Sequence, residues 1–206
     1  MSFYPEPVPV PAMLRTDEML IRPLRVSDVL LDYDAVISSR AELWLRSGGD
    51  WPREGFTIEE NLADLQQHEQ EHQDRLAFTY TVMNPDESEC LGCIYINPLA
   101  RMIERAVATT QQYLASGATG QPPSEVSASD AVVTFWVRQS RLADNLDLRL
   151  LQTLTEWFRT AWTFPRVAYL ARNAQPRQLH LFEQLGMTLF YTLPHAKIYI
   201  LEEMGK

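Results

Sequence analysis

The residues best suited to bind a phosphate lie in the stretch WVRQSRLADNLDLRLL, residues 136–151. Its apolar start is typical of the end of a buried strand, and its leucine spacing is typical of a helix. The first turn of a helix presents unpaired backbone N–H groups and positive partial charge, which attract an anion. Turns that hold phosphate in this way usually contain glycine, and this turn contains none. The stretch therefore raises the question of whether backbone groups alone can hold the anion.

A second pattern with chemical potential is HEQEH, residues 68–72. Histidines four residues apart on a helix share a face and can hold Zn²⁺, with Glu69 as a general base. A zinc protease also needs a third ligand and an apolar wall, whereas the neighbours here are almost all Gln, Glu and Asp. We therefore predict an exposed helix face and no metal.

The two cysteines, Cys90 and Cys93, form the motif CLGC. A thioredoxin-type C-x-x-C begins a helix, whereas CLGCIYIN reads as a strand. One pair cannot make a four-cysteine zinc site, and a site that joins the pair to His68 and His72 is open but not favoured. We predict two small apolar residues on a strand.

Composition limits the partners. The chain has 206 residues, of which 46% are hydrophobic and 22% are charged, and its net charge is −9. An acidic surface repels nucleic acid and anionic lipid, so we expect neither as a partner. No run is long and apolar enough for a membrane span, and the segment MSFYPEPVPVPAM lacks the features of a signal peptide. We expect a cytoplasmic protein, and nothing in the sequence decides whether it forms a homo-oligomer.

The order of predicted elements indicates an α/β protein with a mixed sheet. Strands are predicted at 20–24, 78–83, 90–97, 132–137, 166–171, 187–193 and 197–201, and helices at 27–45, 57–75, 146–161 and 176–185. Thr57 and Glu60 form a capping box at the start of the second helix. This order predicts about six or seven strands flanked by helices.

Three segments make up the predicted domain organisation. Residues 1–13 have prolines at alternate positions from Pro5 to Pro11, which indicates an extended arm. Residues 14–206 form a single domain, with an insert at about 100–129. Within the insert, 101–114 reads as a helix, and 115–129 is rich in Gly, Ser and Pro and is predicted to be a mobile loop that could act as a lid, an interface or neither.

Nearly the whole chain resembles the GNAT superfamily of N-acetyltransferases. The resemblance rests on LRTDEMLIRPLRVSDVLLDYDAVISSRAELW near the start, FWVRQSRLADNLDLRLLQTLTEWF in the middle, and LARNAQPRQLHLFEQLGM near the end. It implies a GNAT-like central sheet in which two strands separate and the pantetheine arm of acetyl-CoA lies between them. It also implies transfer of an acyl group from acetyl-CoA to an amine on a small molecule or a peptide.

The resemblance places the cofactor on residues 136–147, where the family has Arg/Gln-x-x-Gly-x-Gly/Ala. Without gaps, Ala143 replaces the first glycine and adds a methyl group near the pyrophosphate, whereas Asn145 replaces the second and tolerates a left-handed backbone. Asp144 and Asp147 repel a phosphate, and Arg138 and Arg141 can offset that repulsion. The predicted cofactor-binding residues of this stretch are Trp136, Val137, Arg138, Arg141, Ala143, Asp144, Asn145 and Leu146.

The second family motif has also changed. Gln175 stands where the family often has Asn, and Phe182 stands where it often has Tyr. Gln175 can still form amide hydrogen bonds, but Phe182 has no hydroxyl to protonate the leaving thiolate, and simple core packing explains it as well. No carboxylate lies on the strand AVVTFWVR to act as a base. Two functions therefore stay open: an acetyl-CoA-dependent N-acetyltransferase whose base is unidentified, and an inactive GNAT-like protein that binds another ligand or a partner protein.

Overall fold

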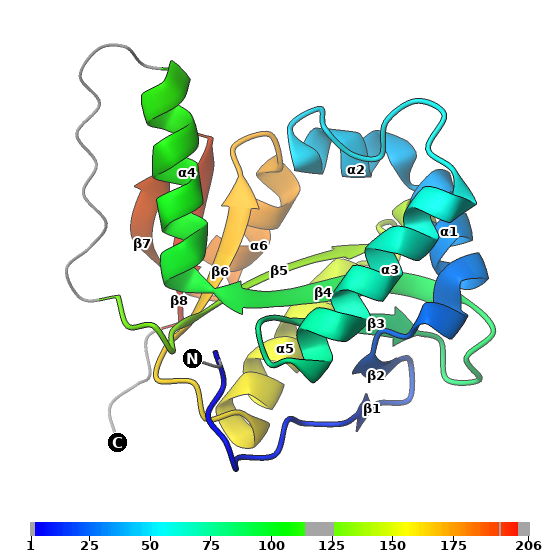
Figure 1. The fold of residues 1–206 in the computed structure, drawn as a ribbon, viewed down its shortest axis with the longest axis horizontal. Helices are drawn as coiled ribbons and strands as arrows, with labels where there is room; N and C mark the ends of the chain where they lie inside the picture. Colours follow the sequence, from blue (N-terminus) through cyan, green and yellow to red (C-terminus); the bar gives the residue numbers. More distant parts are fainter. Residues whose placement is uncertain (1–2, 114–125, 194, 202–206) are drawn as a thin grey trace.

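The computed structural model describes residues 3–113, 126–193 and 195–201, in which one mixed sheet lies between two layers of helices (Figure 1). The described part contains eight strands in the order β1-β2-β3-β4-β5-β6-β8-β7. They are β1 (Leu14–Arg15), β2 (Leu20–Pro23), β3 (Phe78–Met83), β4 (Cys90–Pro98), β5 (Ala131–Val137), β6 (Val167–Arg172), β7 (Thr188–Leu193) and β8 (Ala196–Ile200). Neighbouring strands are antiparallel except β5 and β6, which are parallel.

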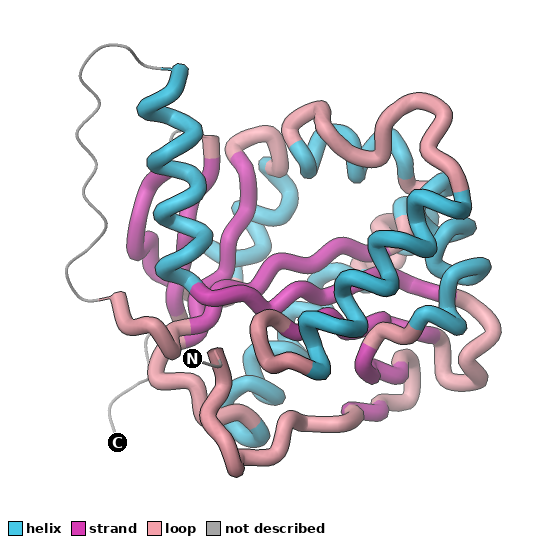
Figure 2. The backbone as a smooth tube through the Cα atoms, viewed as in Figure 1, coloured by secondary structure: helices cyan, strands magenta, loops and turns pink. Residues whose placement is uncertain are grey.

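Helices cover both faces of the sheet, as the tube view also shows (Figure 2). One face carries α1 (Val29–Ser38), α2 (Arg40–Ser47), α3 (Ile58–Gln73) and α4 (Leu99–Tyr113), and the other carries α5 (Leu146–Ala161) and α6 (Pro176–Gln184). Successive side chains of a strand point to opposite faces. Val133, Phe135 and Val137 of β5 accordingly pack with α5, whereas Trp136 packs with α1 and α2.

The seven predicted strands are all present, and their ends differ from the predicted ends by one residue at most. The eighth strand, β1, has only two residues and pairs with β2. A strand this short has no alternation that a sequence pattern can detect, which explains why six or seven strands were expected. The capping box is also present, because Thr57 Oγ1 accepts from the Glu60 N–H and the Glu60 carboxylate accepts from the Thr57 N–H.

The predicted helix over 27–45 is wrong, because the chain bends at Ser39. A 3-10 turn (Val26–Asp28) leads into α1, and Ser39 then separates α1 from α2 with φ −111° and ψ 13°. The buried Ser39 hydroxyl accepts a hydrogen bond from the Gln139 N–H at 3.0 Å. The bend directs α2 across the end of β5, so Leu43 and Arg46 reach a position that a continuous helix would not give them.

Part of the predicted insert is a helix that packs on the sheet. Leu99 and Ile103 of α4 are buried against Val132, Ala168 and Ile198. The helix begins two residues earlier than predicted. Most of the mobile loop predicted over 115–129, namely residues 115–125, lies outside the described residues, as does residue 114 at the end of the predicted helix.

The N-terminal segment lies against the core on the α5 side. Phe3 and Tyr4 are buried, and the Tyr4 hydroxyl accepts hydrogen bonds from the backbone and side chain of Thr163. The Tyr80 hydroxyl donates to the Pro11 carbonyl at 2.5 Å. Aromatic packing and these hydrogen bonds attach the proline-rich segment to the sheet, whereas the division into an arm and a single domain stays a prediction.

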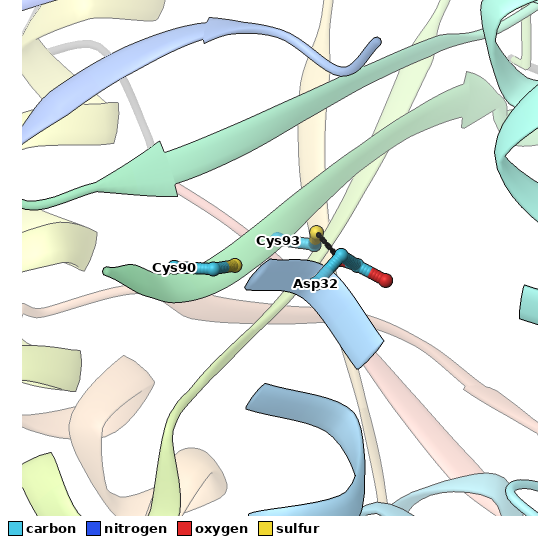
Figure 3. Close-up of side chains that lie close together, drawn as sticks. All are labelled: Asp32, Cys90 and Cys93. Atoms are coloured by element: carbon cyan, nitrogen blue, oxygen red, sulfur yellow. Dashed lines mark hydrogen bonds between the residues drawn. The ribbon is translucent and has the colours of Figure 1, made fainter. Parts of the chain in front are cut away.

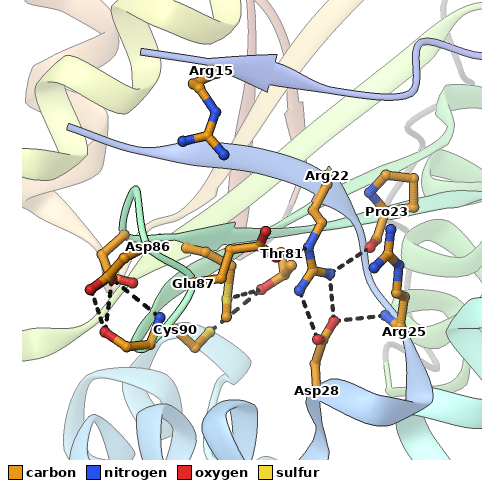
Figure 4. A network of polar contacts seen from close by, with 12 residues as sticks. Arg15, Arg22, Pro23, Arg25, Asp28, Thr81, Asp86, Glu87 and Cys90 are labelled. Atoms are coloured by element: carbon orange, nitrogen blue, oxygen red, sulfur yellow. Dashed lines mark hydrogen bonds and ion pairs between the residues drawn. The ribbon is translucent and has the colours of Figure 1, made fainter. Parts of the chain in front are cut away.

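A buried ion pair fixes the start of α1 (Figure 4). The Arg22 guanidinium of β2 is 5% exposed and donates to both Asp28 carboxylate oxygens at 2.8 Å. Its Nε donates to Glu87 in the β3–β4 turn at 2.7 Å. Hydrogen bonding to Asp28 raises the pKa of Arg22. This bidentate geometry compensates the desolvation of the guanidinium. It also fixes the start of α1, which packs against β4.

The two parallel strands separate after three residue pairs. β5 and β6 pair at Ala131–Val133 with Val167–Tyr169, and they diverge beyond that point (Figure 1). β5 stays paired with β4 as far as Val137, and β6 stays paired with β8 as far as Arg172. The inner edges of both strands therefore lack a ladder partner at their carboxyl ends, which creates a slot in the sheet.

Gly92 of β4 lies where a side chain has no room. A methyl group there would collide with the Trp136 carbonyl oxygen and lie 2.9 Å from the Val137 Cα, both in β5. Backbone atoms of a central strand cannot yield as a flexible side chain can. The close approach keeps the end of β5 paired to β4 where β6 has already departed.

We predict that Gly92→Ala lowers the free energy of unfolding by about 3 kcal/mol, because overpacking against backbone forces the strands apart. The measurement is urea denaturation followed by circular dichroism. Gly186→Ala is the matched control, since Gly186 has φ +71° but no heavy atom within 4 Å of the position that an added methyl group would take. Its strain predicts a loss of only about 1 kcal/mol, and equal losses in both variants would contradict the prediction.

Candidate functional site

Two glutamine side chains bridge the slot between β5 and β6. Gln175 caps the start of α6, and Gln178 lies in its first turn. Gln175 Oε1 accepts from the Arg172 N–H of β6 at 2.9 Å, and Gln175 Nε2 donates to Gln178 Oε1 at 2.8 Å. Gln178 Nε2 then donates to the Phe135 carbonyl of β5 at 3.2 Å. This glutamine bridge, Gln175 and Gln178, satisfies backbone groups that a continued ladder would have satisfied.

A second donor reaches the same carbonyl from the other face of the sheet. Arg46 Nε of α2 donates to the Phe135 carbonyl at 3.3 Å. The cavity that remains in the slot is only about 60 Å³. Its lining residues are Glu42, Leu43, Arg46, Phe135, Trp136, Val137, Leu142, Asp147, Gln175 and Gln178. The slot is therefore present in the backbone but largely filled by side chains.

The turn into α5 takes its shape from Asn145 in place of glycine. Asn145 has φ 55° and ψ 35°, in the left-handed region, and α5 begins at the next residue. A 3-10 turn (Gln139–Arg141) precedes it, and backbone N–H groups of Arg141, Leu142 and Asn145 bond within the turn. The first N–H groups of α5 have no carbonyl within the helix to accept them, as in every helix. The turn thus reaches a helix start without glycine.

Arg177 of α6 lies across this helix start. Its guanidinium donates to both Asp147 carboxylate oxygens, at 2.6 and 2.8 Å, and also to the Leu142 carbonyl and Asn145 Oδ1. The hydrogen bond to Asp147 raises the pKa of Arg177. The Asp147 side chain is 8% exposed, so its charge is neutralised by one arginine from a neighbouring helix.

The two arginines that the sequence offered for this task are paired elsewhere. Arg138 pairs with Asp34 at 2.7 Å and donates to the Cys90 carbonyl at 3.0 Å. Arg141 pairs with Glu89. Both arginines attach the turn to α1 and β4, and Arg177 is the cation at the helix start itself.

The remaining predicted residues lie in three places: the slot, an exposed turn and the core. Trp136, Val137 and Gln175 line the slot. Ala143 and Asp144 lie in the exposed turn, and the Asp144 carbonyl accepts from Arg149. Leu146 and Phe182 are buried in the core on the α5 side, where the Phe182 ring lies between Tyr169 and Tyr199.

Sequence reasoning missed the residues that reach the site from other elements. Glu42 and Arg46 come from α2, and Gln178 and Arg177 come from α6. Gln178 lies one helical turn after Gln175, which is a signal that could have found it. Nothing in the sequence near Arg46 marks it, because only the bend at Ser39 directs α2 to the slot.

A larger polar cavity lies on the α1–α3 side of the sheet. Its volume is about 390 Å³. Tyr95, Asn97 and Thr134 of β4 and β5 line it, together with Leu24, Asp32, Arg46, Trp51, Asn61, Asp64, Leu65, Gln67, His68 and Cys93. A small-molecule site is typically about 300–1,000 Å³, so this cavity is large enough for a small ligand.

Burial changes the pKa values of three side chains that line this polar cavity, Asp32, Asp64 and Tyr95. Burial raises the pKa of the Asp32 carboxyl, which accepts from Asn61 Nδ2 at 2.9 Å. Burial also raises the pKa of the Asp64 carboxyl and of the Tyr95 hydroxyl. Tyr95 therefore stays protonated, and its oxygen accepts from Trp136 Nε1 at 3.2 Å. A cavity with carboxyl groups of raised pKa can accept a proton from a bound ligand.

The prediction of an exposed face at HEQEH is wrong. The His68 ring packs on Tyr95 with centroids 5.4 Å apart, and the His72 ring packs on Phe78 and Tyr80 at 5.1 and 5.3 Å. Aromatic side chains of β3 and β4 cover this face of α3, which the polar neighbours in the sequence did not reveal. His68 borders the polar cavity, whereas His72 lies over the aromatic core.

The two cysteines lie on β4, as predicted, and both are buried and unpaired (Figure 3). The Cys93 thiol donates to Asp32 Oδ1 at 3.4 Å, and hydrogen bonding to Cys90 raises the pKa of Cys93. Within the described residues, Asp32, Cys90 and Cys93 form the only group of three or more His, Cys, Asp or Glu side chains close enough to share a metal ion. The group excludes His68 and His72.

The fold is that of the GNAT acetyltransferases. The structure superposes on a ribosomal-protein-S5-alanine acetyltransferase from Vibrio fischeri with a TM-score of 0.63 and 13% identity, covering 95% of this chain and 100% of that chain. It superposes on RimL, a ribosomal L7/L12 alpha-N-protein acetyltransferase in complex with coenzyme A, with a TM-score of 0.63 and 17% identity, covering 91% and 96%. It also superposes on the microcin C7 self-immunity acetyltransferase MccE, in complex with acetyl-CoA and AMP. The TM-score is 0.63 and the identity is 11%, and the match covers 90% of this chain and 94% of that chain.

Sequence comparisons add no relative to these structures. No family model matches the chain, and no curated protein sequence matches it. The described helices also include none with the length and apolar character that a bilayer crossing requires. The structural comparisons therefore show the fold and not the activity.

We predict that His72 makes the protein less stable in mild acid. Burial lowers the pKa of His72 below its ordinary value near 6.5. In mild acid the histidine is therefore protonated more fully in the unfolded chain than in the folded chain. The free energy of unfolding therefore falls as pH drops below about 6.5. Denaturant titrations at several pH values between about 7 and 5 measure the slope, and His72→Gln is expected to flatten it.

The exposed His180 supplies the matched control for this experiment. His180→Gln should keep the pH dependence of the unmodified protein. If His72→Gln keeps the same slope as well, the acid sensitivity arises elsewhere.

Proposed function

We propose that this protein is an acetyl-CoA-dependent N-acetyltransferase that modifies an amine on a small molecule or a peptide. The observation that carries the proposal is the divergence of β5 and β6, which leaves the Phe135 carbonyl facing a slot. The slot and the polar cavity meet at Arg46, which lines both. A donor in the slot and an acceptor in the polar cavity would therefore face each other across one side chain.

The residues of the slot fit the acyl donor in part. The Phe135 carbonyl can accept an amide N–H of a pantetheine arm, and the first N–H groups of α5 suit a pyrophosphate. Arg177 adds a cation at that helix start. A volume of about 60 Å³ is too small for the arm, so the glutamine bridge must move aside first. When bound, acetyl-CoA would supply an activated acyl group as a thioester.

The polar cavity supplies groups for the amine. An attacking amine must lose a proton, and Asp64 and His68 both line the polar cavity, four residues apart on α3. Burial raises the pKa of Asp64, which makes its carboxylate a better base. We assign proton acceptance to these two side chains. Phe182 lies in the core and has no hydroxyl with which to protonate the leaving thiolate. We assign that role to the hydroxyl of Tyr95, which lines the polar cavity and stays protonated because burial raises its pKa.

A non-catalytic protein is the second candidate, and two observations favour it. The glutamine bridge already satisfies the backbone groups that a pantetheine arm would use. Asp147 places a carboxylate at the helix start, and Arg177 only balances it. In that case the polar cavity would hold a ligand without turnover. A cytoplasmic location stays a prediction for either candidate, as does the expectation that nucleic acid and membranes are not partners.

We predict that acetyl-CoA binds with a micromolar dissociation constant. The measurement is calorimetric titration, with acetylated pantetheine, which lacks the pyrophosphate, as the matched ligand. Because the helix start attracts an anion, the shortened ligand should bind roughly tenfold more weakly. No heat from either ligand at millimolar concentration would refute acetyl-CoA binding and leave the non-catalytic candidate.

We also predict that Gln178→Ala strengthens acetyl-CoA binding by roughly three- to tenfold, since the ligand no longer displaces a hydrogen bond that is worth about 1 kcal/mol. The same titration measures the change. Gln184→Ala, at an exposed position of the same helix, is the control and should leave the affinity unchanged. Weaker binding in Gln178→Ala would show instead that the glutamine contacts the ligand.

A further inference from the structure

Arg46 has its guanidinium in the cavity wall, and none of the carboxylates in the described part of the chain pairs with it. Among residues 3–113, 126–193 and 195–201, no Asp or Glu oxygen lies within 4.0 Å of its nitrogens, whereas Arg22, Arg138 and Arg177 are each paired. Arg46 instead contacts the Phe135 carbonyl and the Tyr95 ring, whose centroid lies 5.7 Å from the guanidinium carbon. The cation is therefore held by one neutral acceptor and one aromatic face.

The surroundings of Arg46 disfavour its positive charge. Burial lowers the pKa of Arg46, and the nearby charge of Arg172 lowers it further. Arg172 lies at the end of β6 beside Gly48, just after α2. The Arg46 residue is only partly exposed, and a charge that is largely removed from water and lacks an ionic partner is unfavourable until an anion reaches it. The position thus favours a ligand that carries negative charge.

Other residues that line the polar cavity favour a positively charged group. Asp64 and His68 of α3 and Asp32 of α1 line it, and Asp32 is already bonded to Asn61 and Cys93. Glu42, one turn before Arg46, lines the slot and not the polar cavity. The polar cavity therefore presents a cation from α2 and carboxyl groups from α1 and α3.

We infer that the polar cavity binds a small amine that also bears a carboxylate, with the carboxylate paired to Arg46 and the ammonium group facing Asp64. An α-amino acid has both groups on one carbon and is small enough for a cavity of about 390 Å³. The role of this ligand as an acyl acceptor rests on the proposed function. Its binding does not, because no contact with acetyl-CoA is needed. Pairing with the carboxylate makes Arg46 the residue that selects the acceptor.

The test compares the twenty standard amino acids with their α-amides, which keep the amine and side chain but lose the negative charge. Binding to the full chain is measured by thermal shift and calorimetry without acetyl-CoA. At least one free amino acid should bind roughly tenfold or more tightly than its amide, because a desolvated ion pair strongly favours the charged ligand. Arg46→Gln should abolish that preference.

Two further variants separate recognition from folding. Arg40→Gln changes an exposed arginine of the same helix and should keep the preference. Arg46→Lys keeps the charge and should retain part of the preference, which a purely structural role for Arg46 would not predict. Equal affinity for acid and amide, a preference that survives Arg46→Gln, or no binding of any amino acid at millimolar concentration would each overturn the inference.

The same samples then distinguish this inference from the proposed function. Thiol release from acetyl-CoA is followed with the amino acid that binds best. Binding with a charge preference but without thiol release upholds the inference and refutes turnover with this acceptor. Thiol release with an amide that is as fast as with the acid refutes the inference and upholds the acetyltransferase.

Discussion

The site depends on one interruption of backbone hydrogen bonding, between β5 and β6. Parallel pairing lasts for three residue pairs and then ends, although both strands continue with their outer neighbours. An unpaired strand edge inside a sheet must satisfy its polar groups in some other way. Here the glutamine bridge and Arg46 do so, and the helices that carry them therefore lie close to the slot. The positions of α2 and α6 are both tied to how that edge is satisfied.

Charge is distributed unevenly around this interruption. The arginines near the turn into α5 are each tied to a carboxylate, so they hold the turn to α1, β4 and α6. Arg46 differs because its neighbours are a carbonyl, an aromatic ring and another arginine. A net charge of −9 for the whole chain thus conceals a local positive site at the junction of slot and polar cavity. Local pairing, rather than net charge, decides what the site attracts.

Part of the site could be predicted from sequence. Asn145 was expected to tolerate a left-handed conformation, and its φ of 55° shows that conformation at the start of α5. Cys90 and Cys93 were expected on a strand and lie on one. The partners of Arg138 and Arg141 were not predictable, because Asp34 and Glu89 are distant in the chain and no pattern links them. The histidines of α3 were misjudged because flanking polar residues do not reveal which face of a helix meets the aromatic side chains of another strand.

The sequence by itself determined seven of the eight described strands and the helices α3, α4, α5 and α6, because alternation, helical spacing and a capping box act over a few neighbouring residues. It also determined the resemblance from which the sheet topology was expected. Tertiary structure alone decided what occupies the slot and what lines the polar cavity. Gln178, Arg177 and Arg46 reach the site only because a bend at Ser39 turns α2 and because α6 packs across the gap. Contacts between distant segments depend on the packing of whole elements, and no local pattern encodes that packing.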